Sequence, residues 1–216
     1  VRSLSEPKRS DLLTCCEIMD TDEINQNLGL RLPVVRIVVA LMPLSIPLIT
    51  RWLQDKKRRE IHFTLFCYLD WASVLPEGDA SRSEALRLVE RYLLETDSEA
   101  ASAAWMAGDL LGDHWPVMES LPVLIRILQQ GRYVAGRKGA LYGVEMMLKN
   151  PDLAPYDRKR LIASVKVVRS HDRSVRLQST ARSMLAKRKS SPAKKSEMAV
   201  SDTQSFPAVP DNIVTD

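Results

Sequence analysis

Apolar residues recur at three- and four-residue steps over residues 97–168, the spacing of helices that each bury one face. In segment 97–112 the stripe consists mainly of small residues: Ala100, Ala104, Ala107 and Leu111. Residues 121–128 carry leucine and isoleucine at the same steps, and residues 135–148 return to small residues. The pattern predicts three helices. Ser98 is the expected start of the first and Gly112 its expected end, and Gly131 is expected to end the second.

The spacing between equivalent positions predicts a repeat. Leu111 and Leu148 lie 37 residues apart. In the alternate helices, the pairs Leu88-Val89, Leu124-Ile125 and Leu161-Ile162 are separated by 36 and then 37 residues. Two sets of positions therefore share one period, with two helices in each unit. That period is typical of an α-solenoid, in which each helix pair buries its apolar face against the next pair.

Two short motifs add a family resemblance. The segment Asp172-Arg-Ser-Val-Arg176 and the ending Leu111-Gly112 resemble the HEAT family of helical repeats, which is related to armadillo repeats. The resemblance extends over roughly residues 48–185 and implies an all-α fold, an α-α superhelix (a HEAT-like solenoid) of about four helical pairs.

The remaining segments complete that organisation. Residues 60–74 and 84–94 carry further helical stripes, separated by the break at 76–79, and Ser81 or Ser83 is the expected start of the second of these helices. A last single helix is expected over residues 174–187. We therefore expect a partly ordered N-terminal arm (1–32), a repeat domain (33–188) and a disordered C-terminal tail (189–216), because the tail is rich in Ser, Pro and Lys and has no apolar period.

The most apolar stretch, residues 33–53, raises the question of a membrane span. Only 14 residues between Arg36 and Arg51 are free of charge, fewer than the roughly 20 that a spanning helix needs. Pro43 and Pro47 would also interrupt such a helix. We expect instead a buried helix pair with a proline break, and no membrane partner.

Positive charge is concentrated near the end of the chain. Residues 158–195 contain thirteen Lys or Arg and one acidic residue, so this segment carries +12 and the rest of the chain −8. A second basic run occupies residues 56–59. Such an uneven distribution of charge favours binding of either a nucleic-acid backbone or an acidic protein. Lys and Arg side chains that simply cover solvent-exposed helix faces explain it equally well.

Motifs for catalysis and cofactors are missing. The glycines of segment 131–138 do not form a phosphate loop, because the lysine is displaced and no Ser or Thr follows it. The three histidines are isolated, and Cys15, Cys16 and Cys67 have no metal-binding spacing. We predict no enzyme, no metal and no cofactor. The cysteines, read as reduced thiols, together with the lack of a secretory leader, predict a cytoplasmic protein.

Trp105 and Asp109 lie four residues apart, so they share a helix face. The pair resembles a tryptophan and an aspartate that a HEAT-like family of DNA glycosylases places in a concave, basic groove. That resemblance implies a base-excision role, whereas the alternative interpretation is a half-packed tryptophan beside an exposed carboxylate.

From these observations we expect a non-enzymatic protein-binding scaffold or adaptor. Its expected binding surface comprises exposed residues of successive repeats: Trp105, Asp109, Arg126, Arg137, Lys138, Arg173 and Arg176. The alternative is a nucleic-acid-binding protein that uses the basic residues 158–195, with or without glycosylase chemistry. The two hypotheses differ in whether the basic residues share one face around Trp105.

Overall fold

A computed structural model describes Thr14 and residues 26–97 and 101–190. Nine α-helices and no strand occur in this part of the chain, which confirms the all-α prediction. Their bounds are α3 Leu28–Ala40, α4 Ile46–Gln54, α5 Arg59–Tyr68, α6 Ala80–Glu95, α7 Ala101–Asp109, α8 Val117–Gln130, α9 Val134–Lys149, α10 Pro155–His171 and α11 Val175–Ser190. Two short 3-10 segments, η1 Lys56–Arg58 and η2 Leu69–Val74, and one π-helical turn, η4 Leu110–His114, extend or join them.

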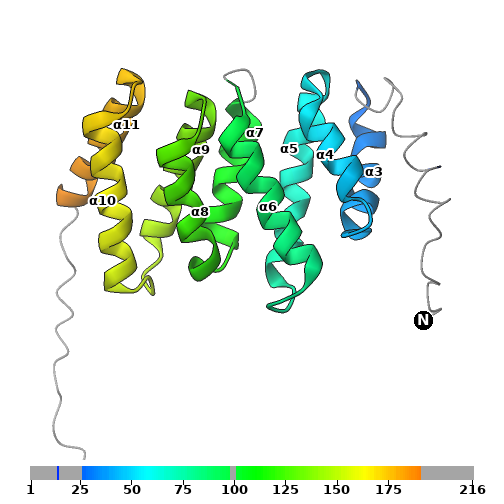
Figure 1. The fold of residues 1–216 in the computed structure, drawn as a ribbon, viewed down its shortest axis with the longest axis horizontal. Coiled ribbons are helices and arrows are strands. Elements are labelled where there is room, and N and C mark those ends of the chain that lie inside the picture. The colour runs from blue at the N-terminus through cyan, green and yellow to red at the C-terminus, as the bar shows by residue number, and fades with distance from the viewer. Residues whose placement is uncertain (1–13, 15–25, 98–100, 191–216) are drawn as a thin grey trace, which may run out of the picture.

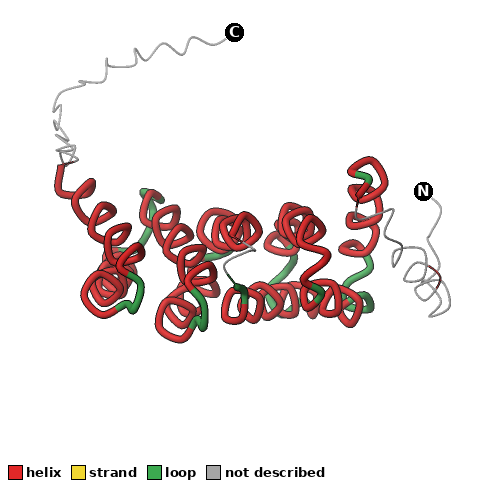
Figure 2. The backbone as a smooth tube through the Cα atoms, turned by 90° about the horizontal axis from the view of Figure 1, so that it is seen from above, coloured by secondary structure: helices red, strands yellow, loops and turns green. Residues whose placement is uncertain are grey.

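The helices stand side by side in an elongated row (Figure 1) and form two layers when viewed from above (Figure 2). In the first layer α3, α5, α7, α9 and α11 contact one another in chain order, and in the second layer α4, α6, α8 and α10 do the same. Each second-layer helix also contacts the first-layer helix that follows or precedes it. One continuous core of Leu, Ile, Val and Ala runs between the layers.

The apolar stretch at residues 33–53 folds as a broken helix pair, as the sequence predicted. The chain leaves α3 at Ala40, turns through a cis Met42–Pro43 peptide bond and enters α4 at Ile46. Val35, Ile49 and Trp52 are fully buried in the core. No helix in the described ranges is both long and apolar enough to cross a membrane.

Two helix boundaries differ from the sequence predictions. Gly112 does not end its helix, because α7 continues through a π-helical turn to His114. The helix expected to begin at Ser81 or Ser83 begins at Ala80, since the Asp79 carboxylate accepts hydrogen bonds from the Ser81 and Arg82 backbone amides. The predicted start at Ser98 and the tail beyond Ser190 lie outside the described residues. Helix α3 begins at Leu28, within the segment 1–32 that was expected to be a partly ordered arm.

The small-residue helices α7 and α9 pack backbone against backbone. A methyl group placed on Gly108 would overlap the Gly139 carbonyl, and one on Gly112 would overlap the Gly143 carbonyl. In the other direction, a methyl group on Gly139 would overlap the Ala104 carbonyl. This close approach requires the glycines, because any side chain would push the two helices apart.

Candidate functional site

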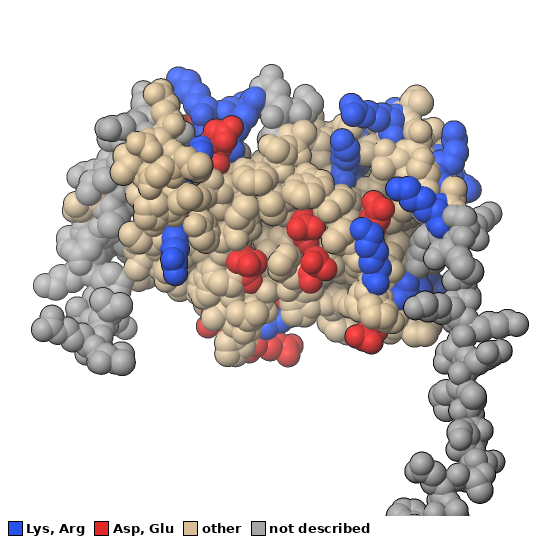
Figure 3. Space-filling view, turned by 180° about the vertical axis from the view of Figure 1, so that it is seen from behind, with Lys and Arg blue, Asp and Glu red and all other residues tan. Residues whose placement is uncertain are grey.

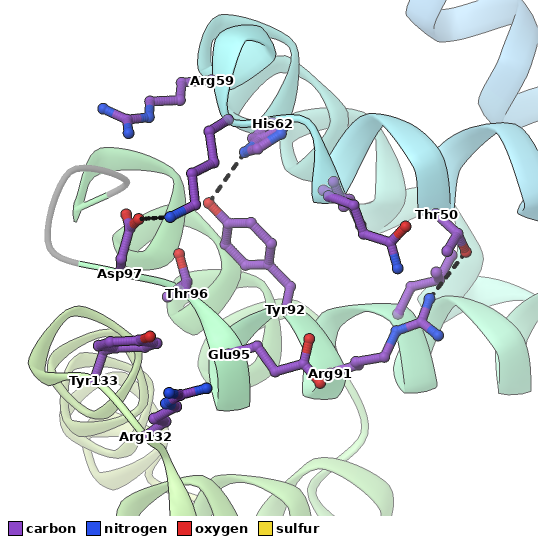
Figure 4. Close-up of a pocket in the computed structure, with 14 residues that line it drawn as sticks. Thr50, Arg59, His62, Arg91, Tyr92, Glu95, Thr96, Asp97, Arg132 and Tyr133 are labelled. Atoms are coloured by element: carbon purple, nitrogen blue, oxygen red, sulfur yellow. Dashed lines mark hydrogen bonds and ion pairs between the residues drawn. The ribbon is translucent and has the colours of Figure 1, made fainter.

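A cavity of about 490 Å³ opens at the edge of the molecule where second-layer helices end and first-layer helices begin. Its walls come from the end of α4, η1, the start of α5, the second half of α6 and the α8–α9 loop (Figure 4). The Arg132 amide donates to the Leu94 carbonyl at 2.9 Å, which holds the α8–α9 loop against the end of α6. Three successive helix pairs therefore contribute to one cavity.

The buried floor of the cavity is formed by His62 and Tyr92. The Nε2 atom of His62 lies 2.7 Å from the Trp52 carbonyl oxygen, and because a carbonyl only accepts, Nε2 carries the proton. The other ring nitrogen, Nδ1, then accepts from the Tyr92 hydroxyl at 3.5 Å. Burial lowers the pKa of His62 and raises the pKa of Tyr92 to about 12. Since both imidazole nitrogens are engaged, the floor has no free general base.

The rim of the cavity is predominantly cationic. Its lining contains Lys56, Arg59, Arg91 and Arg132 against the two carboxylates of Glu95 and Asp97. Lys56 pairs with Asp97 at 3.0 Å, and Arg91 donates to the Thr50 hydroxyl at 2.9 Å. Arg132 stacks over the Tyr133 ring, with its guanidinium carbon 5.2 Å from the ring centroid. This arrangement fits an anionic group and lacks a nucleophile–base pair.

Lys and Arg also gather along this edge over a wider area. In the view from behind, blue atoms lie mostly along the upper edge and toward the α10–α11 end, whereas red atoms lie over the centre and the lower edge (Figure 3). Over the broad middle of that face, where the first-layer helices lie, blue atoms are few and the charged groups are mostly red. The basic residues therefore do not surround the centre of the first layer.

Trp105 and Asp109 share a face of α7, and a residue of α9 joins them. The Trp105 ring lies 5.0 Å from the Tyr142 ring, centroid to centroid. Tyr142 also interacts electrostatically with Asp109, whose pKa is raised above its usual value chiefly by burial. Trp105 is 42 % exposed and Asp109 is half-buried. The sequence analysis missed Tyr142, although it lies 37 residues after Trp105, the same separation as between Leu111 and Leu148.

The basic residues proposed from the sequence lie in separate places. Arg126, on α8 in the second layer, pairs with Glu90 at 2.7 Å. Lys138 lines a pocket beside Trp105 and Tyr142. Arg173 lines a further cavity of about 620 Å³ at the ends of α8 and α10, and Arg176 is exposed near the start of α11. No single site contains all of them.

Arg137 does not belong to the exposed surface where the sequence analysis placed it. Its side chain is 10 % exposed and makes two hydrogen bonds to the Asp172 carboxylate, at 2.8 and 3.0 Å. A third donor reaches the Gly131 carbonyl at 2.7 Å. The guanidinium thus joins the starts of α9 and α11 and is already occupied within the fold.

Part of the cationic cavity was visible in the sequence. The basic run at residues 56–59 supplies Lys56 and Arg59, but Arg91 and Arg132 are isolated in the sequence and gave no signal. His62 was judged an isolated histidine, and its tyrosine partner lies 30 residues away. Within the described ranges, no group of three or more His, Cys, Asp or Glu side chains is arranged to hold a metal ion.

Comparison with protein-family models, with curated proteins and with solved structures found no match to this chain.

Proposed function

We propose that this chain is a non-enzymatic binding protein built from HEAT-like helical pairs, and that its cationic cavity receives an acidic segment of a partner protein. The observation that carries the proposal is the cavity itself, where four cationic side chains from three successive helix pairs face two carboxylates. Complementary charge across such a concave surface attracts an acidic partner and fixes its register.

Contacts between neighbouring helix pairs support the repeat architecture. Arg82 pairs with Glu119, Arg126 with Glu90, and Arg137 with Asp172. The partners are 37, 36 and 35 residues apart in the sequence, close to the period read from the apolar positions. Each ion pair therefore joins one helix pair to the next, as expected for stacked units in a superhelix.

The chemistry of the cavity favours binding over catalysis. His62 would lose the buried hydrogen bond from the Tyr92 hydroxyl on accepting a proton, and Tyr92, with its pKa near 12, stays protonated at neutral pH. The cationic side chains form the rim, where a ligand approaches. An acidic peptide would pair with Arg91 and Arg132 while its backbone lies across the ends of α4 and α6.

We place this activity in the cytoplasm, on the argument that the cysteines are reduced thiols.

A fluorescein-labelled peptide of ten alternating Glu and Gly residues provides the direct test. Fluorescence anisotropy should report binding to the full chain, and Arg91→Glu and Arg132→Glu should each weaken it at least about tenfold, since charge reversal replaces attraction with repulsion across a partly desolvated contact. Arg160→Glu is the matched control, because Arg160 lies on α10 away from the cavity and pairs with Asp157. A peptide affinity that is unchanged by both cavity substitutions would refute the proposal.

A second candidate, nucleic-acid binding, draws on the blue surface near α10 and α11 (Figure 3). Two arginines of α10 are already engaged within the fold: Arg158 donates to the Leu148 and Asn150 carbonyls, and Arg160 pairs with Asp157. A labelled DNA duplex titrated over a salt series in the same assay separates the two functions. Tight duplex binding that weakens steeply with salt and depends on Arg173 and Arg176 would favour nucleic acid.

A further inference from the structure

A second pocket, of about 310 Å³, lies on the first-layer face between α7, α9 and α11. Its most prominent feature is a pair of aromatic rings, the exposed Trp105 from α7 and the half-buried Tyr142 from α9. Ala101, Ala135 and Leu141 add apolar surface, and Thr180 contributes from α11. This pocket is separate from the cationic cavity and shares no lining residue with it.

The aromatic pair is held in place by its surroundings. Tyr142 interacts with Asp109, and its helix is held against α7 by the glycine contacts that bring the two backbones together. Trp105 packs against Tyr142 at an interplanar angle of 43°. A rigid aromatic surface of this kind loses little conformational entropy when it binds a ligand, because its rings are already ordered.

Charge at the pocket is unevenly distributed along α9. Lys138 is exposed and forms no ion pair with any side chain in the described ranges. Glu145 lies seven residues further on, about 10 Å along the helix axis. The pocket therefore fits an apolar segment that presents a carboxylate at the Lys138 end.

The sequence after α11 contains a segment with that chemistry. Residues 206–211 read Phe-Pro-Ala-Val-Pro-Asp, with two prolines three positions apart and an aspartate directly after the second. Prolines at this spacing favour the polyproline II conformation, in which they lie on one side. Grooves lined with aromatic side chains recognise such segments because the proline rings pack flat against the aromatic faces.

We propose that residues 206–211 of this chain bind the Trp105–Tyr142 pocket, with the two prolines against the aromatic rings and Asp211 paired with Lys138. The connection is long enough. Fifteen residues separate Ser190 from Phe206, and this connection spans up to about 50 Å when extended. The helix between Thr180, in the pocket wall, and Ser190 covers only about 15 Å. The tether also raises the effective concentration of the segment to roughly the millimolar range, so a weak contact suffices.

Tryptophan fluorescence tests the contact in the full chain. Trp52 and Trp115 are buried and Trp71 is half-buried, so acrylamide quenching reports mainly on Trp105. Pro207→Ser/Pro210→Ser should increase the quenching of tryptophan fluorescence by acrylamide. Adding a synthetic peptide of residues 204–212 at millimolar concentration to this variant should restore the protection, whereas a peptide of the same composition in scrambled order should not.

A labelled version of the peptide identifies the pocket. In the Pro207→Ser/Pro210→Ser background, Trp105→Ala or Lys138→Glu should abolish its binding, while Tyr156→Ala, which removes an exposed aromatic ring on α10, should leave it unchanged. Equal quenching of the wild-type chain and the proline variant, without peptide binding, would overturn the proposal. Protection that appears only as protein concentration rises would overturn it as well, because the segment would then come from a second copy.

Discussion

The Arg137 guanidinium and the Asp172 carboxylate form a buried, two-point ion pair between the starts of α9 and α11, with hydrogen bonds of 2.8 and 3.0 Å. Asp172 also accepts from the Ser174 backbone amide at 2.7 Å, next to the start of α11. One carboxylate therefore helps to begin a helix and ties it to the preceding helix pair.

Removing either member of this pair should destabilise the fold strongly. Arg137→Ala leaves a buried carboxylate without its cation, so we expect a loss of about 3–5 kcal/mol in the free energy of unfolding. Urea denaturation followed by circular dichroism measures it. The control is Arg126→Ala, which breaks the Arg126–Glu90 pair, where the arginine side chain is 53 % exposed. That change should cost no more than about 1 kcal/mol, and equal losses in the two variants would contradict the structural role of Arg137.

Because α7 and α9 approach so closely, adding a single methyl group at their contact should lower the stability of the fold strongly. Gly139→Ala and Gly143→Ala place a methyl group against the Ala104 and Gly108 carbonyls, which are backbone atoms and cannot move aside. Each should cost about 1–3 kcal/mol or more, because overpacking forces the two helices apart. Gly29→Ala, near the exposed start of α3, meets only the Asn27 side chain and should stay within about 1 kcal/mol of wild type. The melting temperatures of the three variants test this prediction, and equal values for all three would contradict it.

The start of α6 gives a prediction that separates two candidate caps. Asp79→Ala removes the acceptor for the Ser81 and Arg82 amides and should lower the free energy of unfolding by roughly 0.5–2 kcal/mol. Ser83→Ala, at the position that the sequence alone also suggested, should have almost no effect, since Ser83 lies within the first turn of α6 and is exposed. A larger loss for Ser83→Ala than for Asp79→Ala would overturn the assignment.

Because His62 is buried, the stability of the fold should decrease as the pH falls. Burial lowers its pKa in the folded state below the ordinary histidine value of 6.5. The unfolded state therefore binds more protons as the pH falls below about 6.5, and stability should fall with it until the folded pKa is reached. Urea midpoints between pH 7.5 and pH 5 measure this slope. His62→Gln should flatten it, while His171→Gln, at an exposed position, should leave it as in the wild type.

The helices themselves were largely predictable from the sequence. The apolar stripes located α7, α8 and α9, and the prolines and glycines between them located most of the breaks. Two boundaries were wrong for local reasons. Asp79 outcompeted the nearby serines as a cap because Gly78, with a φ of 88°, turns the chain there. Gly112 served a close helix contact instead of a helix end.

The candidate sites were less predictable. Trp105 and Asp109 were found together because a helix places residues four apart on one face, which is a local property. Arg137 was misjudged as exposed because its partner, Asp172, lies 35 residues away. The cationic cavity was missed as a unit because Arg91 and Arg132 come from separate helix pairs and have no motif around them.

The sequence by itself determined that this chain is helical and where its apolar faces lie, since these properties depend on neighbours within one or two helical turns. Only the tertiary structure decided which polar groups meet: His62 with Tyr92, Arg137 with Asp172, and Trp105 with Tyr142. Such pairs depend on how far each helix pair is rotated and displaced against the next. That displacement is set by side-chain packing across the whole interface, including the glycine contacts between α7 and α9.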